Sequence, residues 1–123
     1  MNTIQPFFPK VSDIAHMGVV VASGEITVVE AVNLMERHQL SNIIFENAQG
    51  HGLFTVEDLL QFRRNDGDFS ARLNQQMFQQ LRYIRADEDV VGVMSILDEI
   101  QSRYLGVLDN NEKLCGIVSY ADV

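Results

Sequence analysis

The chain has 123 residues, 46% of them apolar, and a formal net charge of −8. The apolar content is that of a globular protein, and seventeen acidic residues against nine basic ones argue against non-specific binding to nucleic acid or anionic membranes. No apolar run approaches the roughly 20 residues that span a bilayer, and no secretory signal is visible at the N-terminus. The single cysteine, Cys115, excludes an intrachain disulfide and indicates a reducing, cytoplasmic location.

A short strand and a helix are predicted first along the chain. Residues 19–21 are valines ahead of a Ser-Gly break, which is typical of a short β-strand. Thr27 then begins a helix, with Glu30 as its partner in a capping box. Apolar side chains recur at helical spacing and form the buried stripe of this helix: Val28, Ala31, Val32 and Met35.

A β-hairpin and a second helix follow. Residues 43–45 (IIF) predict a buried strand, and residues 47–50 (NAQG) are typical of a turn. Residues 53–54 (LF) open the returning strand, which completes a hairpin. A helix is predicted over residues 56–64, and the turn residues 65–68 mark the connection to the second half.

The second half of the chain repeats this order. A strand is predicted over residues 81–84, a helix capped by Asp89 runs to about residue 102, and a hairpin joins residues 104–108 to residues 114–118. Its second helix would begin where the sequence ends. We therefore expect a fragment of a longer protein in which this last helix is truncated.

One short pattern ends both halves. Residues 52–58 read GLFTVED and residues 116–122 read GIVSYAD: glycine, two apolar residues, a hydroxyl residue, two variable positions and aspartate. When the halves are aligned, Val11 falls on Leu73 and nearly every later pair is apolar on apolar. Such an internal repeat predicts two pseudo-symmetric units, each with a hydroxyl–carboxylate pair at a strand-to-helix junction.

With this order of elements, the chain resembles a tandem pair of CBS (cystathionine β-synthase) domains, a Bateman module. Residues 11–14 (VSDI) resemble the first segment of that family, residues 27–31 (TVVEA) its first helix, and residues 105–109 (LGVLD) its central strand. The strongest match is the family's G-h-x-[ST]-x-x-D motif, which is present in both halves.

The resemblance implies an α/β (α+β) fold of two β-α-β-β-α repeats packed sheet to sheet. It divides the chain into an N-terminal extension, a first repeat, a linker and a second repeat, over residues 1–10, 11–65, 66–71 and 72–123. The family often carries proline just before its central strand, where this chain has Asn42-Ile43 and Leu105-Gly106.

The resemblance also implies a nucleotide site in each half, in the cleft between the repeats. Thr55 and Ser119 would contact a phosphate or another substituent on the ribose 5′ carbon, and Asp58 and Asp122 would bind the ribose hydroxyls. A carboxylate can accept from two hydroxyl groups, and a helix N-terminus favours an anion. The base would lie in an apolar slot near the first strand and hairpin of each repeat, with these candidate residues: Val20, Ile43, Ile44, Leu105 and Val107.

The function implied by the resemblance is a regulatory, non-catalytic module. It would bind AMP, ADP, ATP or S-adenosylmethionine, control an attached effector domain, and pair with a second copy as a homodimer. An assembly module with no small-molecule ligand is the alternative, since Thr-x-x-Asp and Ser-x-x-Asp are also ordinary helix caps. No nucleophile–base pair supports an enzyme, and no metal-ligand spacing connects the histidines: His16, His38 and His51.

Overall fold

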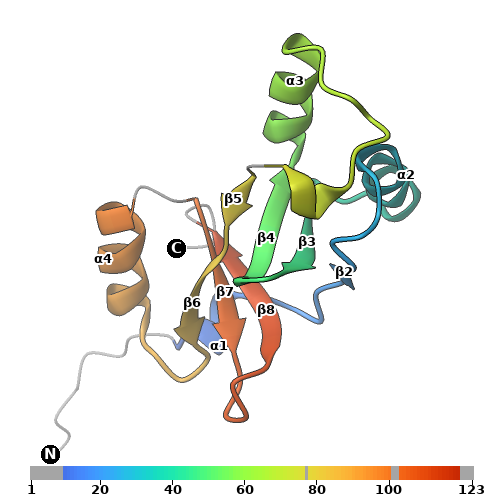
Figure 1. Cartoon of the computed structure of the whole chain (residues 1–123). Helices are drawn as coiled ribbons and strands as arrows, with labels where there is room; N and C mark the ends of the chain where they lie inside the picture. Colours follow the sequence, from blue (N-terminus) through green and yellow to red (C-terminus); the bar gives the residue numbers. More distant parts are fainter. Residues whose placement is uncertain (1–9, 77, 101–102, 120–123) are drawn as a thin grey trace, which may run out of the picture. The chain divides into compact units, whose positions relative to one another are not determined.

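The computed structural model describes residues 10–76, 78–100 and 103–119 (Figure 1). The chain forms two compact units, a continuous unit of residues Val20–Leu81 and a split unit that joins Met1–Val19 to Arg82–Val123. Each unit contains a four-stranded sheet of its own. The predicted α+β class is therefore confirmed, with helices and mixed sheets in both units.

The sheet of the continuous unit has the strand order β2-β3-β4-β5. The first pair is parallel and the two others are antiparallel. The predicted hairpin of residues 43–54 is confirmed as β3 and β4, whereas β2 begins later than the valine run because only its two residues pair with β3. The strands are β2 (Val21–Ala22), β3 (Asn42–Asn47), β4 (Gly50–Thr55) and β5 (Gln79–Gln80).

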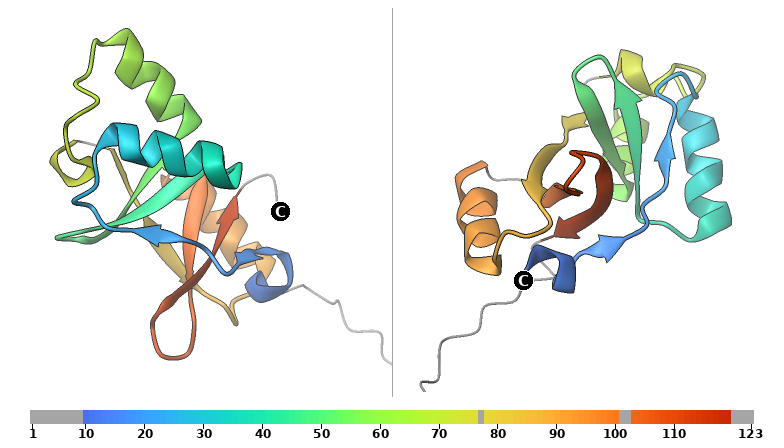
Figure 2. Two further views of the ribbon diagram at one scale, coloured as in Figure 1. Left: turned by 90° about the vertical axis from the view of Figure 1, so that its right-hand side faces the viewer. Right: turned by 90° about the horizontal axis from the view of Figure 1, so that it is seen from below.

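Helices α2 (Val28–His38) and α3 (Val56–Arg64) complete the continuous unit, with a short 3₁₀ helix, η1 (Leu73–Gln75). Thr27 caps α2 as predicted, because its hydroxyl oxygen accepts from the backbone N–H of Glu30 at 3.2 Å, but the reciprocal bond of the predicted capping box, from the Thr27 N–H to the Glu30 carboxylate, is not formed. Figure 2 shows α2 alongside the strands of this sheet. The core forms from buried residues of α2, η1 and the strands: Ala22, Val28, Ala31, Met35, Ile43, Phe45, Phe54 and Leu73.

The sheet of the split unit has the order β1-β8-β7-β6, with β6 and β7 parallel and the other pairs antiparallel. Asp89 accepts from the backbone N–H of Gly92 at 3.0 Å and so caps α4, as predicted. The buried core residues are Val11, Ile84, Val93, Leu97, Leu105, Val107 and Val118. The elements are α1 (Val11–Ile14), β1 (His16–Met17), β6 (Arg82–Arg85), α4 (Val90–Ile100), β7 (Tyr104–Leu108) and β8 (Leu114–Ser119).

The compact units do not follow the repeat boundaries at residues 65 and 72. The N-terminal segment of the first repeat packs into the split unit, where Val11 N–H donates to Glu88 C=O at 2.8 Å and β1 pairs with β8. The corresponding segment of the second repeat packs into the continuous unit, where Leu73 N–H donates to Ile26 C=O at 2.9 Å. Each repeat thus gives its first segment to the sheet of the other repeat. The predicted truncated helix lies outside the described residues.

Candidate functional site

The first copy of the motif lies where β4 ends and α3 begins. Asp58 Oδ2 accepts from the Thr55 backbone N–H at 2.8 Å and from the Thr55 hydroxyl at 3.0 Å. The Asp58 backbone N–H donates in turn to Thr55 Oγ1 at 3.1 Å. The two residues form a reciprocal capping box, which fixes both half-buried side chains at the junction.

This box leaves part of the motif available to a ligand. Within the described part of the chain, all hydrogen bonds of the Asp58 carboxylate go to Oδ2, so Oδ1 remains an acceptor for a hydroxyl group. The N-terminus of α3 is less available to an anion such as phosphate. Its Val56 N–H already donates to Ser41 C=O at 3.1 Å, and its Asp58 N–H donates to Thr55 in the capping box. The junction is therefore better equipped for a polyol such as ribose than for a phosphate.

The strand register places a further polar residue beside Thr55. Asn42 is its direct cross-strand partner, and directly opposed residues project from the same face of a sheet, with Cβ atoms about 5 Å apart. The Asn42 amide is half-buried and makes only a long hydrogen bond, 3.5 Å, to Ser41 Oγ. In the sequence, Asn42 stands out only as a departure from the family pattern, because the register that aligns it with Thr55 is a property of the folded hairpin.

The second copy of the motif ends β8 in the same way. Ser119 is half-buried at the last position of this strand, and its cross-strand partner is Tyr104. Ser119 thus occupies the place of Thr55, with a phenol where the continuous unit has the Asn42 amide. Asp122 lies outside the described residues, so the second hydroxyl–carboxylate pair remains a prediction.

The candidate base-slot residues lie mostly in the cores. Ile43, Ile44, Leu105 and Val107 are at most 3% exposed, because β3 and β7 are the central strands of their sheets. Val20 is 55% exposed and is the one candidate of the five that presents its side chain to solvent. Val20, Ile43 and Ile44 lie in the continuous unit and Leu105 and Val107 in the split unit, so a base slot in each repeat remains a prediction.

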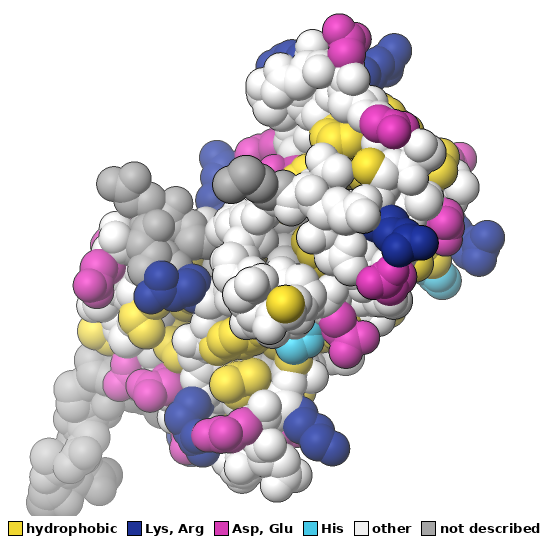
Figure 3. All heavy atoms as spheres, in the orientation of Figure 1, with side chains coloured by type: hydrophobic (Ala, Val, Ile, Leu, Met, Phe, Trp, Pro, Cys, Tyr) yellow, Lys and Arg dark blue, Asp and Glu magenta, His cyan; other side chains and the backbone are white. Residues whose placement is uncertain are grey.

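The described residues contain neither a cluster of metal-ligand side chains nor a helix of membrane-spanning character. No cluster of three or more His, Cys, Asp and Glu side chains is placed there to hold a metal ion. No helix in that part of the chain combines the length and apolar character that a bilayer crossing requires. Lys and Arg side chains are scattered over the face in Figure 3 and interspersed with acidic ones.

Comparison with known proteins agrees with the fold. The sequence model of the CBS domain family matches residues 11–65. The structure is similar to the CBS domain pair of protein MJ0100 in complex with 5′-methylthioadenosine and S-adenosyl-L-methionine (TM-score 0.76, 19% identity, 94% of this chain and 92% of that chain). The chain has the fold of a CBS domain pair. The resemblance predicted from the two motifs is therefore confirmed, since β6, α4, β7 and β8 repeat the strand–helix–hairpin order of β2, α2, β3 and β4.

Two further relatives belong to the same comparison. CBSX2 in complex with AMP has a TM-score of 0.72 at 19% identity, over 92% of this chain and 91% of that chain. An uncharacterized 17.7 kDa protein of Acidianus ambivalens is 28% identical over 116 residues, which are 93% of this chain and 70% of that protein. CBS pairs of this fold thus include proteins solved with adenosine-type ligands.

Proposed function

We propose that this CBS pair is a regulatory module that binds an adenosine-type ligand at the Thr55–Asp58 junction. The observation that carries the proposal is the capping box, which fixes the Asp58 carboxylate and leaves Oδ1 as an acceptor. A ribose presents adjacent hydroxyl groups that suit such a carboxylate. The complexes of two similar CBS pairs with AMP and with S-adenosylmethionine support the ligand class.

The ligands we propose are AMP, ADP, ATP or S-adenosylmethionine. Thr55 Oγ1 and the Asn42 amide flank the position that the ribose would occupy, because the two residues are cross-strand partners. Two of the first three N–H groups of α3 are already bonded, so ribose recognition contributes more than phosphate recognition. We expect AMP and S-adenosylmethionine to bind at least as tightly as ATP.

The regulatory role follows from differential affinity. A ligand that binds one conformation more tightly shifts the equilibrium sensed by an attached effector domain, without any catalytic step. We propose a cytoplasmic homodimer as the working form. Val29 and Val91 support a second copy, because they occupy corresponding helix positions in the two repeats and are 44% and 49% exposed.

The test is isothermal titration and thermal denaturation with AMP, ADP, ATP and S-adenosylmethionine. A ligand at about 100 times its Kd should stabilise the fold by roughly 2.7 kcal/mol, which is several degrees in Tm. Asp58→Asn keeps an oxygen that can accept from Thr55 N–H but loses the carboxylate, so it should weaken binding at least tenfold. Asp68→Asn is the matched control, because Asp68 is an exposed carboxylate in the same unit.

The proposal fails if Asp58→Asn binds as tightly as the unmodified chain. It fails equally if none of the four ligands raises the Tm of the folded protein. The second result would favour the assembly module, in which Thr55 and Asp58 serve only as a helix cap and the exposed valines of α2 and α4 hold a second copy.

A further inference from the structure

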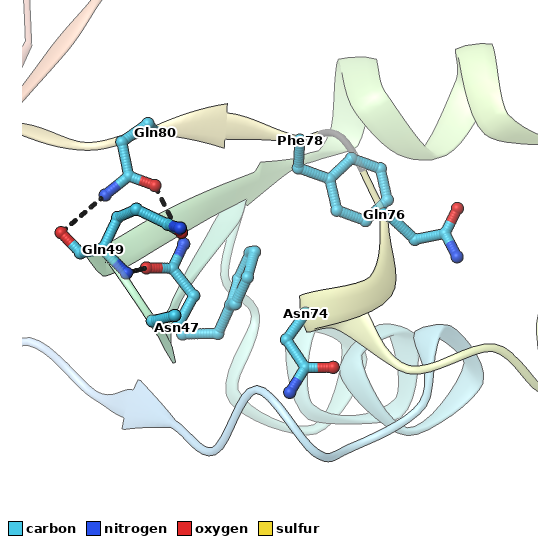
Figure 4. A pocket seen from close by; sticks show the side chains of 8 residues that line it. Asn47, Gln49, Asn74, Gln76, Phe78 and Gln80 are labelled. Carbon is cyan, nitrogen blue, oxygen red and sulfur yellow. Dashed lines mark hydrogen bonds between the residues drawn. The ribbon is translucent and has the colours of Figure 1, made fainter.

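A hollow lies at the opposite end of the β3–β4 hairpin from Thr55. It has a volume of about 330 Å³ and lies within the continuous unit, between the hairpin turn and the segment around η1 and β5 (Figure 4). Six-residue strands at about 3.3 Å per residue separate it from the Thr55–Asp58 junction by roughly 17 Å. Its polar lining is made of carboxamides only: Asn47, Gln49, Asn74, Gln76 and Gln80.

Three of these residues form a closed hydrogen-bond ring. Asn47 Nδ2 donates to Gln80 Oε1 at 2.9 Å, and Gln80 Nε2 donates to the Gln49 carbonyl at 3.3 Å. The Gln49 N–H completes the ring by donating to Asn47 Oδ1 at 3.0 Å. Because each carboxamide has two N–H groups and two lone pairs, Asn47 and Gln80 each keep one donor and one acceptor for a ligand.

An aromatic ring forms the other side of the hollow. Figure 4 shows Phe78 across the hollow from the Asn47–Gln80 pair. The Phe78 ring is half-buried and packs on Phe54 with a centroid distance of 4.8 Å, and it meets the buried Phe45 edge-on at 6.4 Å. These contacts fix the ring, so its exposed part offers an apolar surface opposite the amide groups.

The hollow carries no charge of its own among its lining residues. The nearby Glu25 is engaged on both oxygens, because Oε1 accepts from Asn74 Nδ2 at 3.0 Å and Oε2 pairs with Arg72 at 2.9 Å. No lining residue is a cation that would bind a phosphate. A neutral ligand therefore fits this hollow better than an anionic one.

We propose that this carboxamide hollow binds an uncharged, flat heterocycle of the nucleobase or nucleoside type. A carboxamide places a donor beside an acceptor, which matches the adjacent donor and acceptor atoms on the edge of such a base, as Asn and Gln match adenine in nucleic-acid recognition. Phe78 would contact the apolar face of the heterocycle. This site is independent of the ribose site at Asp58.

The experiment is a titration of the ¹⁵N-labelled full chain with adenosine, followed through the side-chain NH₂ signals of Asn47 and Gln80. We expect saturable shifts of both signals, weaker for AMP because of its charge and absent for glucose, which lacks a flat face. Gln80→Glu removes the donor and adds a charge. It should weaken adenosine binding, as followed through the Asn47 signal, at least tenfold. Gln79→Glu adds the same charge on the neighbouring residue and should leave adenosine binding unchanged.

Asp58→Asn separates the two sites. It should weaken ribose-dependent binding at α3 at least tenfold and leave the shifts of the Asn47 and Gln80 side chains in place. The proposal is overturned if adenosine moves neither NH₂ signal, or if Gln80→Glu responds like the unmodified chain. Equal responses to glucose and adenosine would likewise overturn it, since they would assign the hollow to polyols.

Discussion

The two threonine caps of the continuous unit differ in one residue, with a consequence for binding. At α2 the Glu30 carboxylate accepts from the Thr27 hydroxyl at 3.1 Å, and no bond from the Thr27 backbone N–H to it is formed. At α3 the shorter Asp58 accepts from both the hydroxyl and the backbone N–H of Thr55. Aspartate at this position therefore holds its carboxylate by two bonds to one oxygen, which orients the other oxygen away from the backbone.

A second carboxylate–hydroxyl pair, Asp68 and Ser70, shows how hydrogen bonds change the pKa of a carboxyl group. Asp68 Oδ1 accepts from the Ser70 hydroxyl at 2.6 Å and from the Ser70 backbone N–H at 2.9 Å, and these bonds lower the pKa of Asp68 from its ordinary value of 3.8. Ser70→Ala removes the larger cause and keeps the smaller one. We expect the pKa of Asp68 to rise toward 3.8 in this variant, as measured by an NMR titration of its side-chain carbon.

The pH dependence of stability has a definite sign here. A lowered pKa in the folded state stabilises the fold above the unfolded value and loses this contribution as pH falls through the folded value. The stability difference between the unmodified chain and Ser70→Ala should thus be present at neutral pH and shrink below the ordinary pKa of 3.8. An unchanged Asp68 titration in the variant would contradict this assignment.

At the scale of the elements, the glycine of the repeated motif has a different neighbour in each hairpin. The ring of Phe45 covers Gly52, and three of its atoms would lie closer than 3.0 Å to an added Cβ. At Gly116 an added Cβ would lie 2.8 Å from both the His16 carbonyl oxygen and Met17 Sδ, because β1 crosses there. The glycine of the motif therefore leaves space for an aromatic ring in one sheet and for an edge strand in the other.

Gly52→Ala should destabilise the chain, because the Phe45 ring is only 2% exposed and has little room to move. Overpacking of this kind costs about 1–3 kcal/mol. Gly92→Ala in α4 is the matched control, since its added Cβ would meet no atom closer than 3.6 Å. Alanine is the better helix former, so this variant should gain up to about 1 kcal/mol.

Urea denaturation of both variants measures the two effects on one scale. The midpoint should fall for Gly52→Ala and rise for Gly92→Ala, with unchanged slopes for two-state unfolding. Equal midpoints for the two variants would show that the Phe45 ring yields to the added methyl group.

At the scale of the whole molecule, the first segments of the two repeats are exchanged between the sheets. Val11 and Leu73, which align in the sequence, are both fully buried, Val11 in the core of the split unit and Leu73 in that of the continuous unit. A fragment cut at the repeat boundary thus keeps the first segment of its own repeat, which packs in the other unit. It lacks the first segment of the second repeat, which completes its own sheet and core. Its core would miss Leu73 and its sheet would miss β5.

The fragment 20–81 should therefore fold better than the fragment 11–65. The first contains a complete four-stranded sheet with its core, although a domain of about 60 residues is only marginally stable. The second loses Leu73, and deleting buried leucine atoms alone costs about 2–5 kcal/mol. Circular dichroism melting should show a cooperative transition for 20–81 and none for 11–65. Cooperative melting of 11–65 alone would contradict the exchange.

The sequence by itself determined the elements whose signals are local. The Thr27 and Thr55 caps, the hairpin turn after Asn47 and the helix over residues 56–64 all lie where the pattern predicted them, because capping and turn formation depend on residues within a few positions. The repeat also indicated the CBS pair and the hydroxyl–carboxylate junction, since Thr55 and Asp58 are three residues apart.

Only the tertiary structure decided which segments meet across long sequence distances. The pairing of β1 with β8 and of β5 with β4, the position of Asn42 beside Thr55, and the meeting of Asn47 with Gln80 all depend on strand register. Register is set by the burial of whole strand faces, which no local pattern contains. For the same reason, the complete burial of Leu105 became visible only when β7 was placed at the centre of its sheet.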